Sequence, residues 1–261
     1  MQLQLAGHRL QLCWFQQGLV SSALDGLYGR EILTRARLAG SDEAVPPQRL
    51  FAWLKAEPRR LLDFTIAQVA AVQALDAQWH LDGSLWFNLA GELLAADALF
   101  DELMESTLQS LPPEWRRRLV LEISEDALEQ RLVPERVEAL RQAGFLVAMD
   151  DFGAGYSNLG RLQAGGFDIL KLDLGLMSAV PEKIWAASFY RQVVELAAST
   201  GSQVVAEGVE RRTQADFVRW AGVDLIQGFL FSRPQPLRPL RNGGLVLQPL
   251  KPKETLDERP V

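Results

Sequence analysis

The chain has 261 residues, of which 48% are hydrophobic and 23% charged, as in an ordinary globular protein rather than a disordered one. Its 27 basic and 33 acidic residues leave a formal charge of −6, which predicts no general attraction for DNA or an anionic membrane. A single cysteine, Cys13, and two histidines outside any metal-binding spacing exclude a disulfide and disfavour a zinc protease or a serine triad.

Short apolar or β-branched runs of strand length recur along the chain, with amphipathic segments between most of them. In chain order the runs are residues 10–15, 85–89, 119–123, 145–149, 169–172, 203–206 and 225–226, and helical spacing appears within 61–75, 99–108, 133–140, 189–197 and 217–221. This alternation predicts a mostly parallel sheet covered by helices, and about eight runs in roughly 250 residues favour a closed α/β barrel. An open doubly wound sheet is the competing fold, but no G-x-G-x-x-G motif follows any run.

The remaining segments suggest one domain with a tail. Residues 39–47 have the composition of an exposed loop, and residues 247–261 are rich in proline and charge. We therefore predict a single barrel domain over residues 1–246 and a disordered C-terminal tail over 247–261.

A polar side chain stands at the C-terminal end of six successive runs. These residues are Asn88, Glu122, Asp150 with Asp151, Lys171, Glu207 and Gln227. A single acid after a strand is most often a helix cap or a surface residue, so the argument depends on the joint pattern. In a barrel these ends converge on one face, where the active sites of this fold are built.

This pattern would bring several carboxylates together, and their negative charges would have to be balanced. Glu31, Glu122, Asp150, Asp151 and Glu207 would meet in one barrel mouth, where like charges raise each other's pKa. Two divalent cations would relieve this repulsion, and oxygen-only ligands favour Mg²⁺ or Mn²⁺ over Zn²⁺. The adjacent acids Asp150 and Asp151 could bridge two ions, the usual arrangement for attack of water on a phosphodiester.

Seven short motifs follow one another in order over residues 10–236. They are Glu31-Ile32-Leu33-Thr34-Arg35, Asn88 in an apolar run, Glu122-Ile123-Ser124-Glu125, DDFGAGYSNL at 150–159, Lys171-Leu172-Asp173, AEGVE at 206–210 and Gln227-Gly228-Phe229. Together they resemble the EAL family of cyclic-di-GMP phosphodiesterases. The resemblance implies a TIM-like (β/α)8 barrel with one antiparallel strand, and hydrolysis of cyclic di-GMP to linear pGpG with two Mg²⁺ or Mn²⁺ ions.

The resemblance also implies a role for each matching residue. The metal ligands would be Glu31, Asn88, Glu122, Asp150 and Asp151, and the catalytic residues would be Lys171, Glu207 and Glu31. Cyclic di-GMP would contact Gln16, Leu33, Arg35 and Gln227. Glu125 would brace the loop that follows Asp151.

Some positions depart from the family pattern. Ile32, Ala36, Gln17 and Ala154 replace the usual Ala, Trp, Pro and Thr, which bears on substrate affinity and on coupling through the loop after Asp151. The alternative to an enzyme is a cyclic-di-GMP receptor or interaction module that binds without cleaving. The complete set of ligands favours the enzyme.

Location and partners follow from what the chain lacks. The N-terminus has no secretory signal, and no stretch approaches the ~18 apolar residues of a membrane span, so the cytoplasm is expected. We expect no sensor or cyclase segment outside the barrel. Regulation is therefore expected to come from an unidentified protein partner, from a homodimer or from control of expression.

Overall fold

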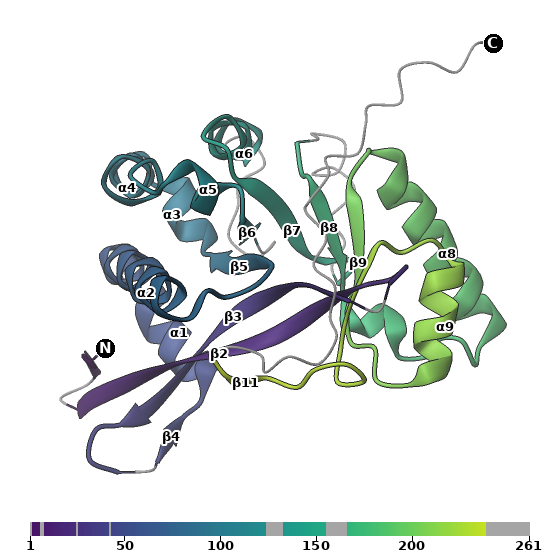
Figure 1. The fold of residues 1–261 in the computed structure, drawn as a ribbon, viewed down its shortest axis with the longest axis horizontal. Helices are drawn as coiled ribbons and strands as arrows, with labels where there is room; N and C mark the ends of the chain where they lie inside the picture. Colours follow the sequence, from purple (N-terminus) through teal and green to yellow (C-terminus); the bar gives the residue numbers. More distant parts are fainter. Residues whose placement is uncertain are drawn as a thin grey trace.

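A closed barrel of eight strands forms the centre of the molecule (Figure 1). The computed structural model describes residues 2–5, 8–24, 26–41, 43–123, 133–154 and 166–238. The barrel strands are β2 (His8–Ser21), β3 (Leu27–Leu38), β5 (Ser84–Leu89), β6 (Leu119–Ile123), β7 (Leu146–Phe152), β8 (Ile169–Leu172), β9 (Gln203–Ala206) and β10 (Leu225–Gln227).

The direction of the strands confirms the expected TIM-like α/β fold. From β3 through β5, β6, β7, β8 and β9 to β10, each strand pairs in parallel with the next. Strand β2 closes the ring and runs antiparallel to both of its neighbours, β3 and β10. One antiparallel strand in an otherwise parallel barrel is what the motifs implied.

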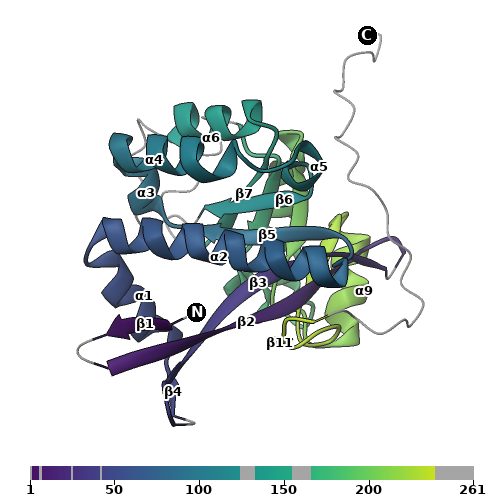
Figure 2. The same ribbon diagram turned by 60° about the vertical axis from the view of Figure 1, so that its left-hand side comes forward.

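Helices surround the ring on its outside (Figures 1 and 2). They are α1 (Pro47–Lys55), α2 (Pro58–Trp79), α3 (Gly91–Ala95), α4 (Asp97–Leu103), α5 (Pro113–Arg116), α6 (Val133–Gln142), α8 (Ile184–Ser199) and α9 (Arg212–Trp220), with a π-helix at Met104–Leu108 and a 3₁₀ turn, η3, at Leu174–Met177. Prolines begin α1, α2 and α5, where the missing N–H costs no helical hydrogen bond.

Strands β2 and β3 continue past the barrel as a long hairpin, visible in Figure 2. Strands β1 (Gln2–Leu5) and β4 (Ala44–Val45) pair with this extension, and β11 (Gln235–Pro236) pairs with β2. In the barrel itself, Leu19 pairs with Gln227 and Glu31 pairs with Trp86. The barrel ends of the hairpin therefore bring Glu31 beside the other strand ends.

Two apolar clusters hold the fold together. The larger lies between the strands and the helices, and the smaller fills the barrel with Leu19, Tyr28, Trp86, Val120, Ala148, Ile169, Val205 and Leu225. Side chains alternate across a strand, so residues two positions beyond an inward-facing one also point inward. Adding two to the last six members gives Asn88, Glu122, Asp150, Lys171, Glu207 and Gln227. The apolar layer therefore forms a floor beneath a polar layer.

The sequence predictions differ from the structure mainly outside the parallel strands. All seven predicted runs overlap strands, although Phe145 lies one residue before β7, and β3 was not predicted. The expected loop at 39–47 contains β4 and the start of α1, and the segment 99–108 divides into the end of α4 and the π-helix. The predicted boundary at residue 246 and the tail at 247–261 lie outside the described residues.

Candidate active site

A buried lysine occupies the centre of the polar layer. The Nζ atom of Lys171 lies 3.1 Å from Glu122 Oε1, 2.9 Å from Asp150 Oδ1 and 2.8 Å from Glu207 Oε1. Lys171 is only 1% exposed and Glu122 is fully buried. The run-end pattern predicted that these side chains converge on one face of the barrel, and the structure places one lysine among three carboxylates there.

Glu31 is held by two amides from strands on either side of the hairpin. Asn88 donates its Nδ2 hydrogen to Glu31 Oε1 at 2.9 Å, and Gln227 donates from Nε2 to Oε2 at 2.7 Å. Both carboxylate oxygens are therefore fixed. The Asn88 side chain uses its nitrogen here, which leaves its oxygen as an acceptor.

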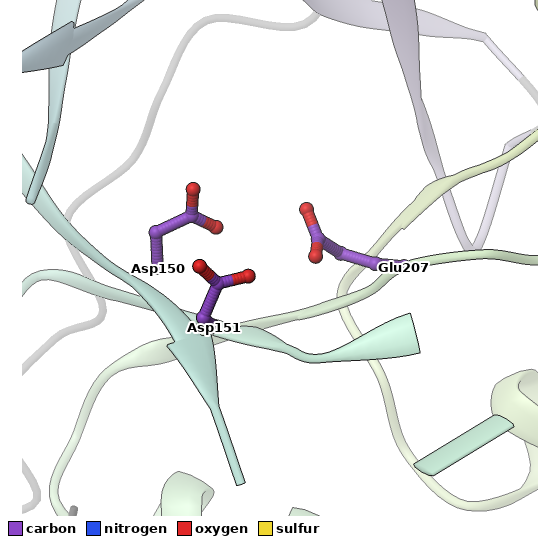
Figure 3. Close-up of side chains that lie close together, drawn as sticks. All are labelled: Asp150, Asp151 and Glu207. Atoms are coloured by element: carbon purple, nitrogen blue, oxygen red, sulfur yellow. The ribbon is translucent and has the colours of Figure 1, made fainter. Parts of the chain in front are cut away.

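The adjacent acids Asp150 and Asp151 face Glu207 across the mouth (Figure 3). One carboxylate oxygen from each of the three lies within 4.8 Å of the others. Consecutive residues of a regular strand point to opposite faces, but the register of β7 shifts between Met149 and Phe152. Asp151 also has a φ of 59°, in the left-handed region that Asp tolerates better than most residues. This irregularity turns both aspartates toward the same cluster.

The electrostatics follow from burial and from mutual contact. Burial raises the pKa of Glu122 well above its usual value, against the lowering effect of Lys171. Burial likewise raises the pKa of Glu207 to about 7, again opposed by Lys171. Burial alone would lower the pKa of Lys171, but the carboxylates around it, led by Glu122 and Glu207, raise it well above the usual value. Lys171 therefore remains a cation at neutral pH.

Several buried acceptors in this layer lack a hydrogen bond. Among the described residues, both oxygens of Glu122 and Oδ1 of Asp150 have no hydrogen-bond partner, although Lys171 lies at ion-pair distance. Unpaired buried acceptors are costly, so they indicate a missing electropositive partner. Carboxylate and amide oxygens without sulfur or imidazole suit a hard divalent cation such as Mg²⁺ or Mn²⁺. The residues present therefore fit a divalent metal centre.

The loops that follow β8, β9 and β10 lock against one another. A Cβ atom on Gly208 would lie 2.6 Å from Leu174 Cβ, and one on Gly228 would lie 2.0 Å from Val209 O. The side chain of Gln214 accepts the N–H groups of Glu210 and Arg211 at 3.0 Å. The same amide donates to Met177 O in η3 at 3.2 Å. This contact set fixes the three strand ends that carry Lys171, Glu207 and Gln227.

A cavity of about 960 Å³ opens above the polar layer. Glu31, Glu207 and Gln227 line it together with Leu33 and Arg35 from the hairpin. The guanidinium of Arg35 lies 5.6 Å from the ring centroid of Phe15 and donates to Thr34 O at 2.9 Å. Cavities that bind small molecules commonly measure about 300–1,000 Å³, so a dinucleotide is of the right size class.

Gln16, which we predicted to contact substrate, does not lie in this cavity. It pairs with Ile32 on the outward face of the hairpin, is 2% exposed, and bonds to Arg30 and to Arg238 O. Gln17 pairs with Glu31 and lines the cavity instead. A hairpin centred on Leu24 gives this register, so counting back from Glu31 would have found Gln17.

The remaining predicted positions divide into two groups. Glu31, Asn88, Glu122, Asp150, Asp151, Lys171, Glu207, Leu33, Arg35 and Gln227 gather at one end of the barrel. Glu125 lies outside the described residues. The departures Ile32 and Ala36 are each 2% exposed in the packed core and face away from Glu31, so neither intrudes on the carboxylates.

No described helix is long and apolar enough to cross a membrane.

Comparisons with known proteins agree with this geometry. A curated relative, the probable cyclic di-GMP phosphodiesterase PdeN of Escherichia coli, is 30% identical over 80% of this chain and 40% of its own length. The cyclic di-GMP phosphodiesterase NbdA of Pseudomonas aeruginosa is 38% identical over 47% of this chain and 16% of its own length. The chain therefore spans well under half of each of these relatives.

The fold comparison and the family comparison point the same way. A solved structure of BlrP1 from Klebsiella pneumoniae with manganese and cyclic di-GMP superposes with a TM-score of 0.70 at 30% identity. The match covers 90% of this chain and 58% of that one. A family model of the EAL domain matches residues 1–234. The chain belongs to the EAL domain family.

Proposed function

We propose that this chain is a metal-dependent phosphodiesterase that hydrolyses cyclic di-GMP to linear pGpG. The observation that supports this proposal most directly is the ring of oxygen ligands around Lys171. Some of these buried carboxylate oxygens lack a hydrogen-bond partner among the described residues. The names of the relatives and the manganese and cyclic di-GMP complex of BlrP1 support the same substrate and cofactor.

The proposed metal ligands are those predicted from the sequence. Glu31, Asn88, Glu122, Asp150 and Asp151 would hold two Mg²⁺ or Mn²⁺ ions, with Glu207 close enough to join them. When bound, such ions neutralise the carboxylates, hold the phosphate and lower the pKa of an attacking water. The amide bonds to Glu31 restrict its rotation and present its oxygens in one orientation.

The proposed catalytic residues are Lys171, Glu207 and Glu31. The cationic Lys171 can donate a hydrogen bond to the water or offset charge that develops on the phosphoryl oxygens. The Glu207 carboxylate lines the cavity and lies 2.8 Å from Lys171 Nζ, so it is placed to take a proton from a water molecule between them and the phosphate.

The proposed nucleotide contacts come from the cavity walls. Arg35 can bind a phosphate with two parallel hydrogen bonds, and Leu33 offers an apolar surface beside it. Gln227 Oε1 is buried without a partner among the described residues, which suits a donor group on the ligand. Gln17 takes the place that we first expected for Gln16.

One incubation tests the proposal. Purified chain with Mn²⁺ or Mg²⁺ should convert cyclic di-GMP to pGpG, measured by chromatography of the products, and Glu31→Ala should abolish turnover. Glu105→Ala, a change at an exposed acid on the π-helix, is the matched control and should leave turnover intact. Binding without product in either metal would favour the receptor instead.

The proposed partners are cyclic di-GMP, a second copy of the chain and a regulatory protein. A homodimer would show twice the mass of one chain in sedimentation analysis. We further propose a cytoplasmic location, where the protein would encounter cyclic di-GMP.

A further inference from the structure

The segment after β10 returns to pair with β2 and forms one wall of the cavity. We call residues 228–238 the strap. Gly228, Phe229 and Pro234 of the strap line the cavity. The strap then pairs with β2 through β11, with Gln235 opposite Gln16, and Leu237 donates its N–H to Trp14 O at 2.9 Å. The position of this wall therefore depends on how the strap is attached to β2.

Two consecutive glutamines of β2 attach it. Gln17 donates from Nε2 to Ser232 O at 3.0 Å, and Gln16 donates from Nε2 to Arg238 O at 2.9 Å. Their side chains leave opposite faces of β2, yet both reach strap carbonyls. The prolines at 234 and 236 carry no N–H, so the strap offers few backbone donors of its own. Side-chain donors from β2 therefore supplement its pairing.

A buried arginine orients the Gln16 amide. Arg30 donates from Nη1 to Gln16 Oε1 at 2.7 Å and from Nη2 to Asp82 O at 2.8 Å. Arg30 is 1% exposed, and both of these acceptors are uncharged oxygens. Burying a guanidinium among neutral oxygens is costly. The buried Arg30 fixes the orientation of the Gln16 amide. The amide oxygen faces Arg30, so the amide nitrogen faces the strap.

We propose that Gln16, oriented by Arg30, is a positioning residue that fixes the strap and thereby the cavity wall formed by Phe229 and Pro234. The part of this inference that concerns the nucleotide rests on the proposed function. The part that concerns the strap does not.

The sharpest test is Gln16→Glu. The new carboxylate still accepts from Arg30, which preserves the buried contact, but it cannot donate to Arg238 O. Amide hydrogen exchange at Leu237 and Phe231 should quicken about tenfold in the ligand-free protein. Exchange at Val147 in β7 should stay unchanged. The KM for cyclic di-GMP should rise about fivefold, with little change in kcat.

Gln11→Glu is the matched control, because Gln11 is an exposed glutamine on the same strand. It should alter neither exchange nor KM. Should Gln16→Glu fail to fold, a double change of Gln16→Met and Arg30→Met replaces both partners by apolar side chains and should give the same exchange pattern.

Each outcome bears on one of the two ideas. Unchanged amide hydrogen exchange at Leu237 would show that Gln16 does not fix the strap, whether or not the protein is active. Faster exchange with an unchanged KM would overturn the link to the cavity wall. Wild-type protein without turnover would defeat the proposed function, while the exchange result would still decide the role of Gln16.

Discussion

At the scale of single residues, charge compensation decides the chemistry of the site. Lys171 lies at ion-pair distance from three carboxylates, of which Glu122 is fully buried. Carboxylates in such surroundings are tolerated only if something positive balances them. The same lysine therefore compensates buried charge and is the proposed catalytic residue, and the two roles can be measured separately.

Lys171→Met should remove the compensation. We expect the metal-free protein to lose about 3–5 kcal/mol of unfolding free energy, measured by urea denaturation in EDTA, and to lose turnover in Mn²⁺. Lys183→Met changes an exposed lysine and is the control for stability. An unchanged denaturation midpoint in Lys171→Met would show that the carboxylates do not need their cation.

Arg35→Ala should weaken binding more than it lowers turnover. We expect the Kd for cyclic di-GMP to rise by about tenfold or more, while kcat at saturation falls less, because a phosphate contact that is present in ground and transition states alike contributes uniform binding. Calorimetric titration and steady-state kinetics measure the two effects. Arg37→Ala, two residues along the same strand, is the control. An unchanged Kd would remove Arg35 from the nucleotide contacts.

The raised pKa of Glu207 gives a pH signature. Its folded-state pKa of about 7 exceeds the ordinary value of 4.5, so its contribution to stability is fully present below pH 4.5 and is lost as the pH rises through 7. A divalent cation binds the deprotonated form. Mn²⁺ should therefore raise Tm more at pH 8 than at pH 5.5, by a difference on the order of 5 °C.

Thermal scans with EDTA or Mn²⁺ measure this difference. Glu207→Gln stays neutral, so the metal-free variant should lose less stability between pH 5.5 and 8 than the wild type. A larger Mn²⁺ effect at pH 5.5 would contradict the assignment.

At the scale of elements, strands β5 to β10 and part of β2 were predictable from the sequence, and β3 was not. Each strand from β5 to β10 is a buried apolar run with a polar residue at or next to its C-terminal end, a pattern that is visible in the sequence alone. Strand β3 mixes Arg30, Thr34, Arg35 and Arg37 with apolar residues without a continuous apolar run, and so it resembles none of the predicted strands. A shift of one residue exchanges the faces of a strand, and this is why Gln16 was expected where Gln17 lies.

The interlocked loops give a prediction at this scale. Gly228→Ala would place a Cβ atom 2.0 Å from the Val209 carbonyl oxygen, which is backbone and cannot move aside alone. We expect a loss of about 2–3 kcal/mol in urea denaturation together with reduced turnover, because Gln227 is the preceding residue. Gly18→Ala meets the flexible end of Leu27 at 3.2 Å and Ser232 Cβ at an ordinary contact distance of 3.5 Å, so it should be mild. Equal effects of the two changes would contradict the close-packing argument.

At the scale of the whole molecule, the length of the chain and the alternation of strand-like and helix-like segments predicted the barrel. They did not predict that one of its strands runs antiparallel to the others. Seven strand-length runs separated by helical segments indicate parallel pairing, which β2 violates. Nothing in the composition of β2 encodes its direction, and only the resemblance implied it. The additions β1, β4 and β11 are two to four residues long, too short to stand out by periodicity.

The apolar floor of the barrel has a kinetic consequence. So far as the described residues extend, Trp86 and its neighbours fill the barrel axis directly beneath the carboxylates. The cavity is therefore closed at the end where the carboxylates lie. In the proposed hydrolysis, cyclic di-GMP and pGpG would then enter and leave through the same opening, so that one excludes the other. Added pGpG should therefore raise the apparent KM in steady-state assays without lowering kcat, and a fall in kcat alone would imply a back exit.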